Sequence, residues 1–248
     1  MVQISKVLIP KAADYLALNL RTQILTGALP EGMLLPNERE LSERASISRT
    51  SVREALRILE GEGLIAIRTG RKGGSEVIKP SSSGIEKSID IFIKGQGIRM
   101  QAVSEVREAI EPHAAKLAAQ NRTNEDLDEL KKSHTALKES AEDIPAFLKA
   151  NLDWHMNVVK ASHNELLIAF MSAISKSFYE STDVTDFNSV EIRNAVAVAH
   201  QRVNTAIESS NPDSAFRRMS QHVSAYITSV EQISKPIKPI KPIKPKLI

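Results

Sequence analysis

The stretch NERELSERASISRTSVREALRILEG, residues 37–61, predicts two short helices joined by a tight turn. Asn37 is a favoured N-cap, so the first helix covers 38–44. The letters ASIS then form the turn, and Ser48 caps a second helix over 49–60 that ends at a glycine. Apolar residues of this second helix share one face and are expected to pack inward: Val52, Ala55, Leu56 and Leu59.

The flanking segments complete a small domain around this helix pair. Residues 12–26 predict a preceding helix, because Leu16, Leu20 and Ile24 recur at intervals of four before a glycine. After the pair, GLIAIRTG and SEVIKP predict two short strands joined by a glycine-rich turn. Three helices followed by such a hairpin are typical of a winged helix-turn-helix that binds DNA.

The face of the second quoted helix opposite its apolar stripe has the chemistry that reads DNA. Arg49 and Arg53 lie one turn apart there, with Thr50 near the start of the helix. A guanidinium can bind guanine O6 and N7 with two donors, or hold a phosphate as a fork. In the hairpin, Arg71 and Lys72 can meet phosphates. Each feature alone suits a solvated face or an ordinary turn, but their combination favours a DNA-binding surface.

Composition excludes several classes of protein. The chain of 248 residues has no cysteine, which excludes disulfides and thiolate chemistry. Its longest apolar runs are too short to span a membrane, and its start lacks the pattern of a secretory signal. We therefore expect no membrane partner and a location in the cytoplasm. The net charge of +3 divides into a basic first part, an acidic body and a basic end.

Glycine usage divides the chain, because all ten glycines lie before residue 98. We expect a winged helix-turn-helix domain over 1–80, a linker with one short helix over 81–97, and an antiparallel all-α bundle over 98–234. The fold class is therefore mainly α, with one small β-hairpin wing. The end, 235–248, repeats Lys-Pro-Ile and is expected to be extended and disordered, while DNA contact through its five lysines is the alternative.

Polar residues of the bundle suggest a metal site. Asn151 and His155 lie one turn apart in NLDWH, while His200 and His222 fall on the last two predicted helices. Helix bundles often build metal sites in this way, and imidazole with oxygen ligands suits zinc, nickel or manganese. The alternative is that each histidine is a partly buried polar residue satisfied by a neighbour.

The segment LTGALPEGMLLPNERELSERASISRTSVREALRILEGEGLIAIRTGRKGG resembles the winged-helix domain of the GntR family of bacterial regulators. The resemblance implies that Arg39, Arg49 and Arg53 contact DNA and that Gly70 forms the tip of the wing. It also implies phosphate contacts from three hydroxyl groups at the start of the reading helix: Ser48, Thr50 and Ser51.

The helical part is similar to the ligand-binding domain of the FadR subgroup, on EVREAIEPHAAKLAAQ, ANLDWHMNVVKASHN and AHQRVNTAIESSNPDSAFRRMSQHV. Many members of that subgroup bind a metal through one Asp and three His, with an organic acid beside it. Here His155, His200 and His222 match, and Asn151 stands where the subgroup has Asp. An amide oxygen is a weaker ligand than a carboxylate, so the ion would be held less tightly and would keep more charge for an anionic effector.

Arg107 occupies the place of a subgroup arginine, which implies that it anchors the effector's carboxylate. The alternative is an ion pair with Glu111 or Glu108. The remaining histidines are expected to be surface or packing residues: His113, His134 and His163.

The resemblance implies a homodimeric repressor or activator on a palindromic operator in double-stranded DNA, responding to a small organic acid. It also implies a bacterial protein that lies at the nucleoid when it is bound to DNA. One alternative is an architectural DNA-binding dimer without an effector. Another is a metal-dependent hydrolase, but no HExxH, GxSxG or phosphate-binding loop occurs. We therefore expect a regulator and not an enzyme.

Overall fold

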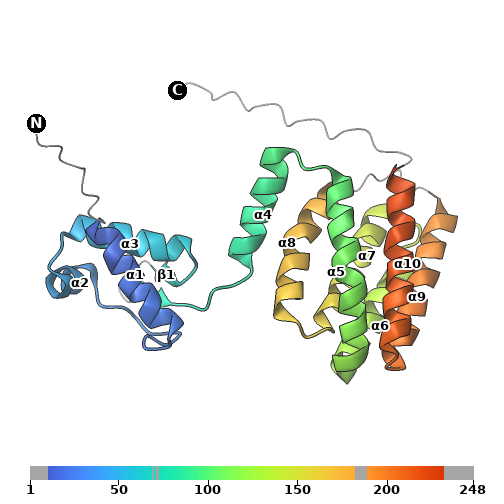
Figure 1. Ribbon diagram of the computed structural model, residues 1–248, viewed down its shortest axis with the longest axis horizontal. Helices are drawn as coiled ribbons and strands as arrows, with labels where there is room; N and C mark the ends of the chain where they lie inside the picture. The colour runs from blue at the N-terminus through green and yellow to red at the C-terminus, as the bar shows by residue number, and fades with distance from the viewer. Residues whose placement is uncertain (1–10, 69, 71–72, 182–188, 232–248) are drawn as a thin grey trace, which may run out of the picture. The chain divides into compact units, whose positions relative to one another are not determined.

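A computed structural model describes residues 11–68, 70, 73–181 and 189–231. The chain divides into two compact units between Gly84 and Ile85 (Figure 1). Each unit has its own core. The mainly helical fold with one two-stranded sheet confirms the predicted fold class. No helix among the described residues is both long and apolar enough to cross a membrane.

The first unit is a winged helix-turn-helix. It contains α1 (Ala12–Leu25), α2 (Glu38–Ala45) and α3 (Arg49–Gly61), followed by β1 (Ile65–Arg68) and β2 (Gly74–Val77). The strands are antiparallel, with Ile65 opposite Val77 and Arg68 opposite Gly74. The inward face of α3 is buried as predicted: Val52, Ala55, Leu56 and Leu59.

Helix α1 packs differently from its predicted stripe. Leu20 is buried, but Leu16 and Ile24 are only partly buried at the edge of the core. Ala13 and Ala17 are the other fully buried residues of α1. Their short side chains let α1 approach the core closely. Leu16 and Ile24 therefore lie at the edges of the contact.

The predicted caps fix where the helices of this unit begin. The Asn37 side chain accepts hydrogen bonds from the backbone N–H groups of Arg39 and Glu40, in a capping box with Glu40. The Ser48 hydroxyl accepts one from the Ser51 N–H. Because these bonds satisfy orphan donors at each helix start, they set the direction in which α3 leaves the turn.

The second unit is a helical bundle. Its main helices are α5 (Met100–Asn121), α6 (Asn124–Glu139), α7 (Ile144–Lys160), α8 (Glu165–Ser181), α9 (Val190–Glu208) and α10 (Pro212–Glu231). Helix α5 packs against α7, α8, α9 and α10 and so forms the centre of the unit (Figure 1). Trp154 is a fully buried member of the core between these helices.

Helix α4 (Ser83–Gln96) precedes the bundle and differs from its other helices, because none of its residues is fully buried. Ile89 and Ile93 rest partly against the cluster that includes Val103 and Met171. Ile91 and Phe92 remain 60% and 59% exposed. Helix α4 therefore has apolar side chains that the rest of its unit does not cover.

Candidate functional site

The outer face of α3 presents the residues predicted to read DNA. Arg49, Thr50 and Arg53 are all exposed on it. Nε of Arg53 lies 2.7 Å from the carboxylate of Glu38, at the first turn of α2. The helix-turn-helix thus places two arginines on one accessible surface, at the start of a capped helix.

Arg39 lies on α2 and is also exposed, with Nε 2.9 Å from the Glu43 carboxylate one turn later. The hydroxyl groups of Ser48 and Ser51 already have hydrogen-bond partners, because their oxygens lie 3.0 Å apart and Ser48 also caps α3. Either hydroxyl would have to share its hydrogen bonds with a phosphate.

The wing follows α3 directly. Gly70 is exposed and has φ of 115°, a conformation that strains any residue with a side chain, so a glycine is required at this turn. Arg71 and Lys72 lie outside the described residues. A cleft of about 460 Å³ lies between the helices and the hairpin, and its lining includes Arg53 and Ile67.

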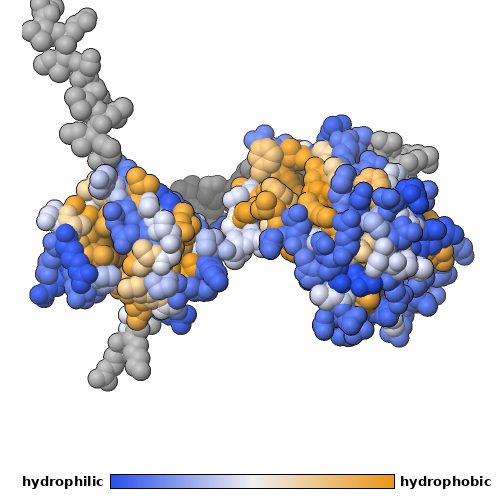
Figure 2. Space-filling model, turned by 60° about the horizontal axis from the view of Figure 1, so that its bottom comes forward, coloured by the Kyte–Doolittle hydropathy of each residue, from blue (hydrophilic) through white to orange (hydrophobic). Residues whose placement is uncertain are grey.

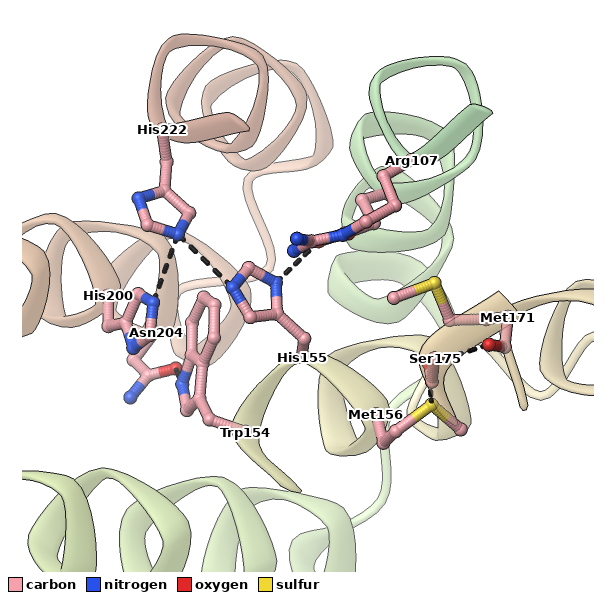
Figure 3. A network of polar contacts seen from close by, with 10 residues as sticks. Arg107, Trp154, His155, Met156, Met171, Ser175, His200, Asn204 and His222 are labelled. Carbon is pink, nitrogen blue, oxygen red and sulfur yellow. Dashed lines mark hydrogen bonds and ion pairs between the residues drawn. The ribbon is translucent and has the colours of Figure 1, made fainter. Parts of the chain in front are cut away.

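The bundle brings the three predicted histidines together from α7, α9 and α10 (Figure 3). Nε2 of His222 lies 3.0 Å from Nε2 of His200 and 3.3 Å from Nε2 of His155. Their candidate ligand atoms all lie within 4.8 Å of one another. Three imidazole nitrogens therefore converge on one point in the interior.

Burial keeps these imidazoles neutral. It lowers the pKa of His222 to about 3, and it lowers the pKa of His200 well below the ordinary value, with the neighbouring rings adding to the effect. For His155, burial lowers the pKa although Glu111 opposes it. Neutral imidazole is the form that binds a metal. At most one proton can lie between Nε2 of His222 and Nε2 of either neighbouring histidine. The unprotonated ring nitrogens therefore favour a cation that the three histidines share.

Two of the three nitrogen spacings, those at His222, also fit a metal ion. Two nitrogens bound at about 2.0–2.1 Å lie about 3.4 Å apart in a tetrahedral site and about 3.0 Å apart at right angles. The distances at His222 fall at these values. Asn151, one turn before His155, is buried and its Oδ1 has no hydrogen-bond partner in the described structure. An unsatisfied buried acceptor one turn before a candidate ligand on the same helix suits a fourth, oxygen ligand.

Glu111 joins the histidines to Arg107. The Arg107 Nε and the His155 Nδ1 each lie 2.5 Å from one of its two carboxylate oxygens, and all three side chains are buried. Burial would raise the pKa of Glu111, but Arg107 and His155 outweigh it and lower the value to about 2. Ionised Glu111 accepts the Nδ1–H of neutral His155, which leaves the Nε2 lone pair directed at His222.

Arg107 therefore forms the ion pair with Glu111, which was one of the alternatives predicted for it from the sequence. Glu108 instead accepts a hydrogen bond from the Ser224 hydroxyl. The spacing of Arg107 and Glu111 indicated that pair, but the second contact of Glu111, with His155, was not predicted. Two further residues were also missed: Trp154, which stacks on His200, and Asn204, which accepts a hydrogen bond from the Trp154 indole (Figure 3).

The other histidines take separate positions. His113 is exposed and packs edge-on against Phe216. His163 lies 2.7 Å from the Asp126 carboxylate at the surface. His134 is buried in α6, and its charge is among those that lower the pKa of His200.

A winged helix-turn-helix joined to a helical domain with a buried polar centre defines a class, the DNA-binding regulators with an attached sensor domain. Residues 12–73 match the family described as bacterial regulatory proteins, gntR family, and residues 102–225 match the FCD domain. The chain therefore belongs to the GntR family and contains an FCD domain, which confirms the resemblance seen in the sequence. It is a transcription regulator and not an enzyme.

Relatives span most of the chain. The HTH-type transcriptional repressor NanR of Enterobacter sp. strain 638 is 26% identical over 226 residues, covering 87% of this chain and 84% of the relative. NanR of Escherichia coli K12 is 29% identical over 203 residues, covering 79% and 75%. The solved structure of Streptococcus agalactiae GntR aligns with a TM-score of 0.69 at 26% identity, covering 88% of this chain and 99% of that one.

Proposed function

We propose that the protein is a dimeric repressor that binds a palindromic operator through α3 and the wing, and releases or tightens its hold when a small organic acid binds the FCD domain. The observation that supports operator reading best is the exposed pair of Arg49 and Arg53 on α3 of a GntR-type head. Such a regulator acts on the chromosome, in the bacterial cytoplasm. The NanR relatives are repressors by name.

Gel shifts on the DNA upstream of the protein's own gene test operator reading. Arg49→Ala and Arg53→Ala should each abolish the specific shift, because each removes a bidentate donor to a base or phosphate. Lys131→Ala in the bundle is the control, since it removes one exposed positive charge without touching α3. Specific binding that survives in both arginine variants would contradict the proposal.

The exposed apolar face of α4 supports a homodimer. A helix of this length is marginal without a partner, and two of its large side chains, Ile91 and Phe92, are more than half exposed. Figure 2 shows apolar residues gathered on the side of the bundle unit where α4 lies. We propose that a second copy covers this face, as a two-fold operator requires.

Sedimentation measurements test the dimer. Ile91→Glu with Phe92→Glu should convert the dimer to a monomer, because two buried charges at an interface core are strongly unfavourable. Val198→Glu is the control, since Val198 is 52% exposed on α9 and away from α4. A dimer that persists in the double variant would place the interface elsewhere.

The converging histidines support a bound divalent ion. His155, His200 and His222 would ligate it through Nε2, with Asn151 as the oxygen ligand, and zinc, nickel and manganese all suit this donor set. Such an ion would supply a positive charge in the core. Metal analysis should find about one ion per chain, and His200→Ala should remove it. His113→Ala should not, because His113 is exposed and apart from the site.

The charge of the buried centre supports an anionic effector. With a divalent ion in place, Arg107 and the ion would outweigh the single carboxylate of Glu111, and Asn151 adds no negative charge. We propose that the carboxylate of an organic acid binds beside Arg107 and offsets this excess.

Melting temperatures measured with a panel of hydroxy acids, sugar acids and amino acids test the effector. The true effector should raise the melting temperature of the wild type and change operator affinity, whereas Arg107→Lys should lose most of both responses. A lack of response to every acid, with operator binding intact, would favour the architectural dimer.

A further inference from the structure

The only tryptophan of the chain lies against the histidine cluster. The indole of Trp154 and the imidazole of His200 are stacked, with ring centroids 3.5 Å apart and planes inclined by 8°. Trp154 meets the other two histidines edge-on. Both Trp154 and His200 are fully buried. The flat indole therefore covers one face of the His200 ring.

The indole is itself held in place from its edge. Its Nε1–H donates a hydrogen bond of 3.0 Å to Oδ1 of Asn204, which lies one turn after His200 on α9 (Figure 3). Helix α9 therefore contacts the indole twice, with an imidazole on its face and an amide on its edge. These two contacts leave the indole little freedom to rotate. The indole in turn restricts the rotation of the His200 imidazole stacked on it.

The other anchored ligand, His155, is oriented differently. Its Nδ1–H is held by Glu111, which is the common way in which a ligating imidazole is oriented. Nδ1 of His200 is buried and has no hydrogen-bond partner in the described structure. No hydrogen bond at Nδ1 thus fixes the plane or tautomer of His200, and the stack with Trp154 is the contact that covers its ring face.

We propose that Trp154 and Asn204 are positioning residues that hold the His200 ring so that its Nε2 faces His222. This inference rests on the proposed metal site. It assigns the orientation of the His200 ring to an aromatic contact and not to a carboxylate or carbonyl. The indole face, held in place by Asn204, restrains the His200 ring where a hydrogen bond at Nδ1 would otherwise do so.

Zn²⁺ affinity of the full chain, measured by competition with a chromophoric chelator, tests the proposal. Trp154→Leu removes the flat face and should weaken binding by about 10–100-fold, the usual effect of losing a support of a metal ligand. Trp154→Phe keeps an aromatic face and should recover much of that loss. Asn204→Leu should weaken binding less than Trp154→Leu does.

A double variant separates positioning from general packing. Since Asn204 acts through the indole N–H, Asn204→Leu should cost no further affinity in a Trp154→Phe background. The control is Leu137→Ala, which empties a fully buried position of α6 outside this cluster. It should lower the melting temperature of the metal-free protein and leave Zn²⁺ affinity unchanged.

The tryptophan also provides an independent signal. Adding Ni²⁺ to the metal-free wild type should quench Trp154 emission, because the indole is stacked on a ligand of the ion, and His222→Ala should abolish the response. If the wild type binds neither ion, the metal site itself is wrong and the positioning role falls with it. If the wild type binds Zn²⁺ but Trp154→Leu, Trp154→Phe and Asn204→Leu bind it equally well, only the positioning role is overturned.

Discussion

The Arg53 guanidinium on α3 lies 2.7 Å from the Glu38 carboxylate on α2. A residue proposed to read DNA is therefore paired within its own domain while DNA is absent. Both side chains are partly exposed, and ion pairs of this kind are worth about 0–1 kcal/mol. DNA can displace such a partner easily, so Glu38 restrains Arg53 without blocking it.

Glu38→Gln should therefore strengthen binding to non-specific DNA by up to about fivefold, because it removes a competing negative charge near the phosphates. The ratio of specific to non-specific affinity should fall. Fluorescence anisotropy at two salt concentrations measures both. Glu62→Gln is the control, since that carboxylate pairs with Arg21. Weaker non-specific binding by Glu38→Gln would show instead that Glu38 aligns Arg53 for DNA.

The separate cores predict independent unfolding of the two units. Leu59 is fully buried in the head, and Leu59→Ala should destabilise that unit by about 2–5 kcal/mol through lost burial and the cavity left behind. Calorimetry should show a lower head transition, lost operator binding and an unchanged bundle transition. A bundle transition that moved with the head would mean that the two units unfold together.

Short-range features were predictable because their causes are local. Asn37 and Ser48 were expected as N-caps, and each side chain accepts a backbone N–H within its own helix start. The burial of one face of α3 followed from its periodicity in the same way. In α1, the burial of Ala13 and Ala17 was not predicted, because helix spacing alone does not say how closely two helices approach.

The candidate metal centre was only partly predictable. His155, His200 and His222 were named from their places on three predicted helices, and a resemblance supported them, since periodicity alone cannot say which faces of distant helices meet. Trp154 and Asn204 are 50 residues apart, and Glu111 and His155 are 44 apart. No local pattern encodes such contacts, because they depend on how α5, α7 and α9 pack.

Asp126 should make the stability of the bundle depend on acid pH. Burial raises its pKa, but hydrogen bonds from Thr123 and the contact with His163 outweigh this and lower it below the ordinary value. Because the folded pKa is lowered, this stabilisation is full above the unfolded pKa of about 3.9 and disappears as pH falls through the folded value.

Urea unfolding of Asp126→Asn and wild type between pH 7 and pH 3 measures this contribution. The variant should be less stable at pH 7, and the difference should shrink as pH falls below about 4. Asp128→Asn, at an exposed position of the same helix, should show no such convergence. A difference that stays constant with pH would contradict the assignment.

Asn151→Asp should change the metal-free and metal-bound proteins in opposite directions. A carboxylate is a stronger ligand than an amide oxygen, so Zn²⁺ affinity should rise by about tenfold or more, equivalent to at least about 1.4 kcal/mol. Without metal, the new charge would be buried where Oδ1 of Asn151 has no hydrogen-bond partner, and it should lower the melting temperature. Asp153→Asn is the matched control, because Asp153 is half exposed and pairs with Lys149. Chelator competition and thermal unfolding with and without Zn²⁺ provide both readouts, and unchanged affinity in Asn151→Asp would remove this position from the metal site.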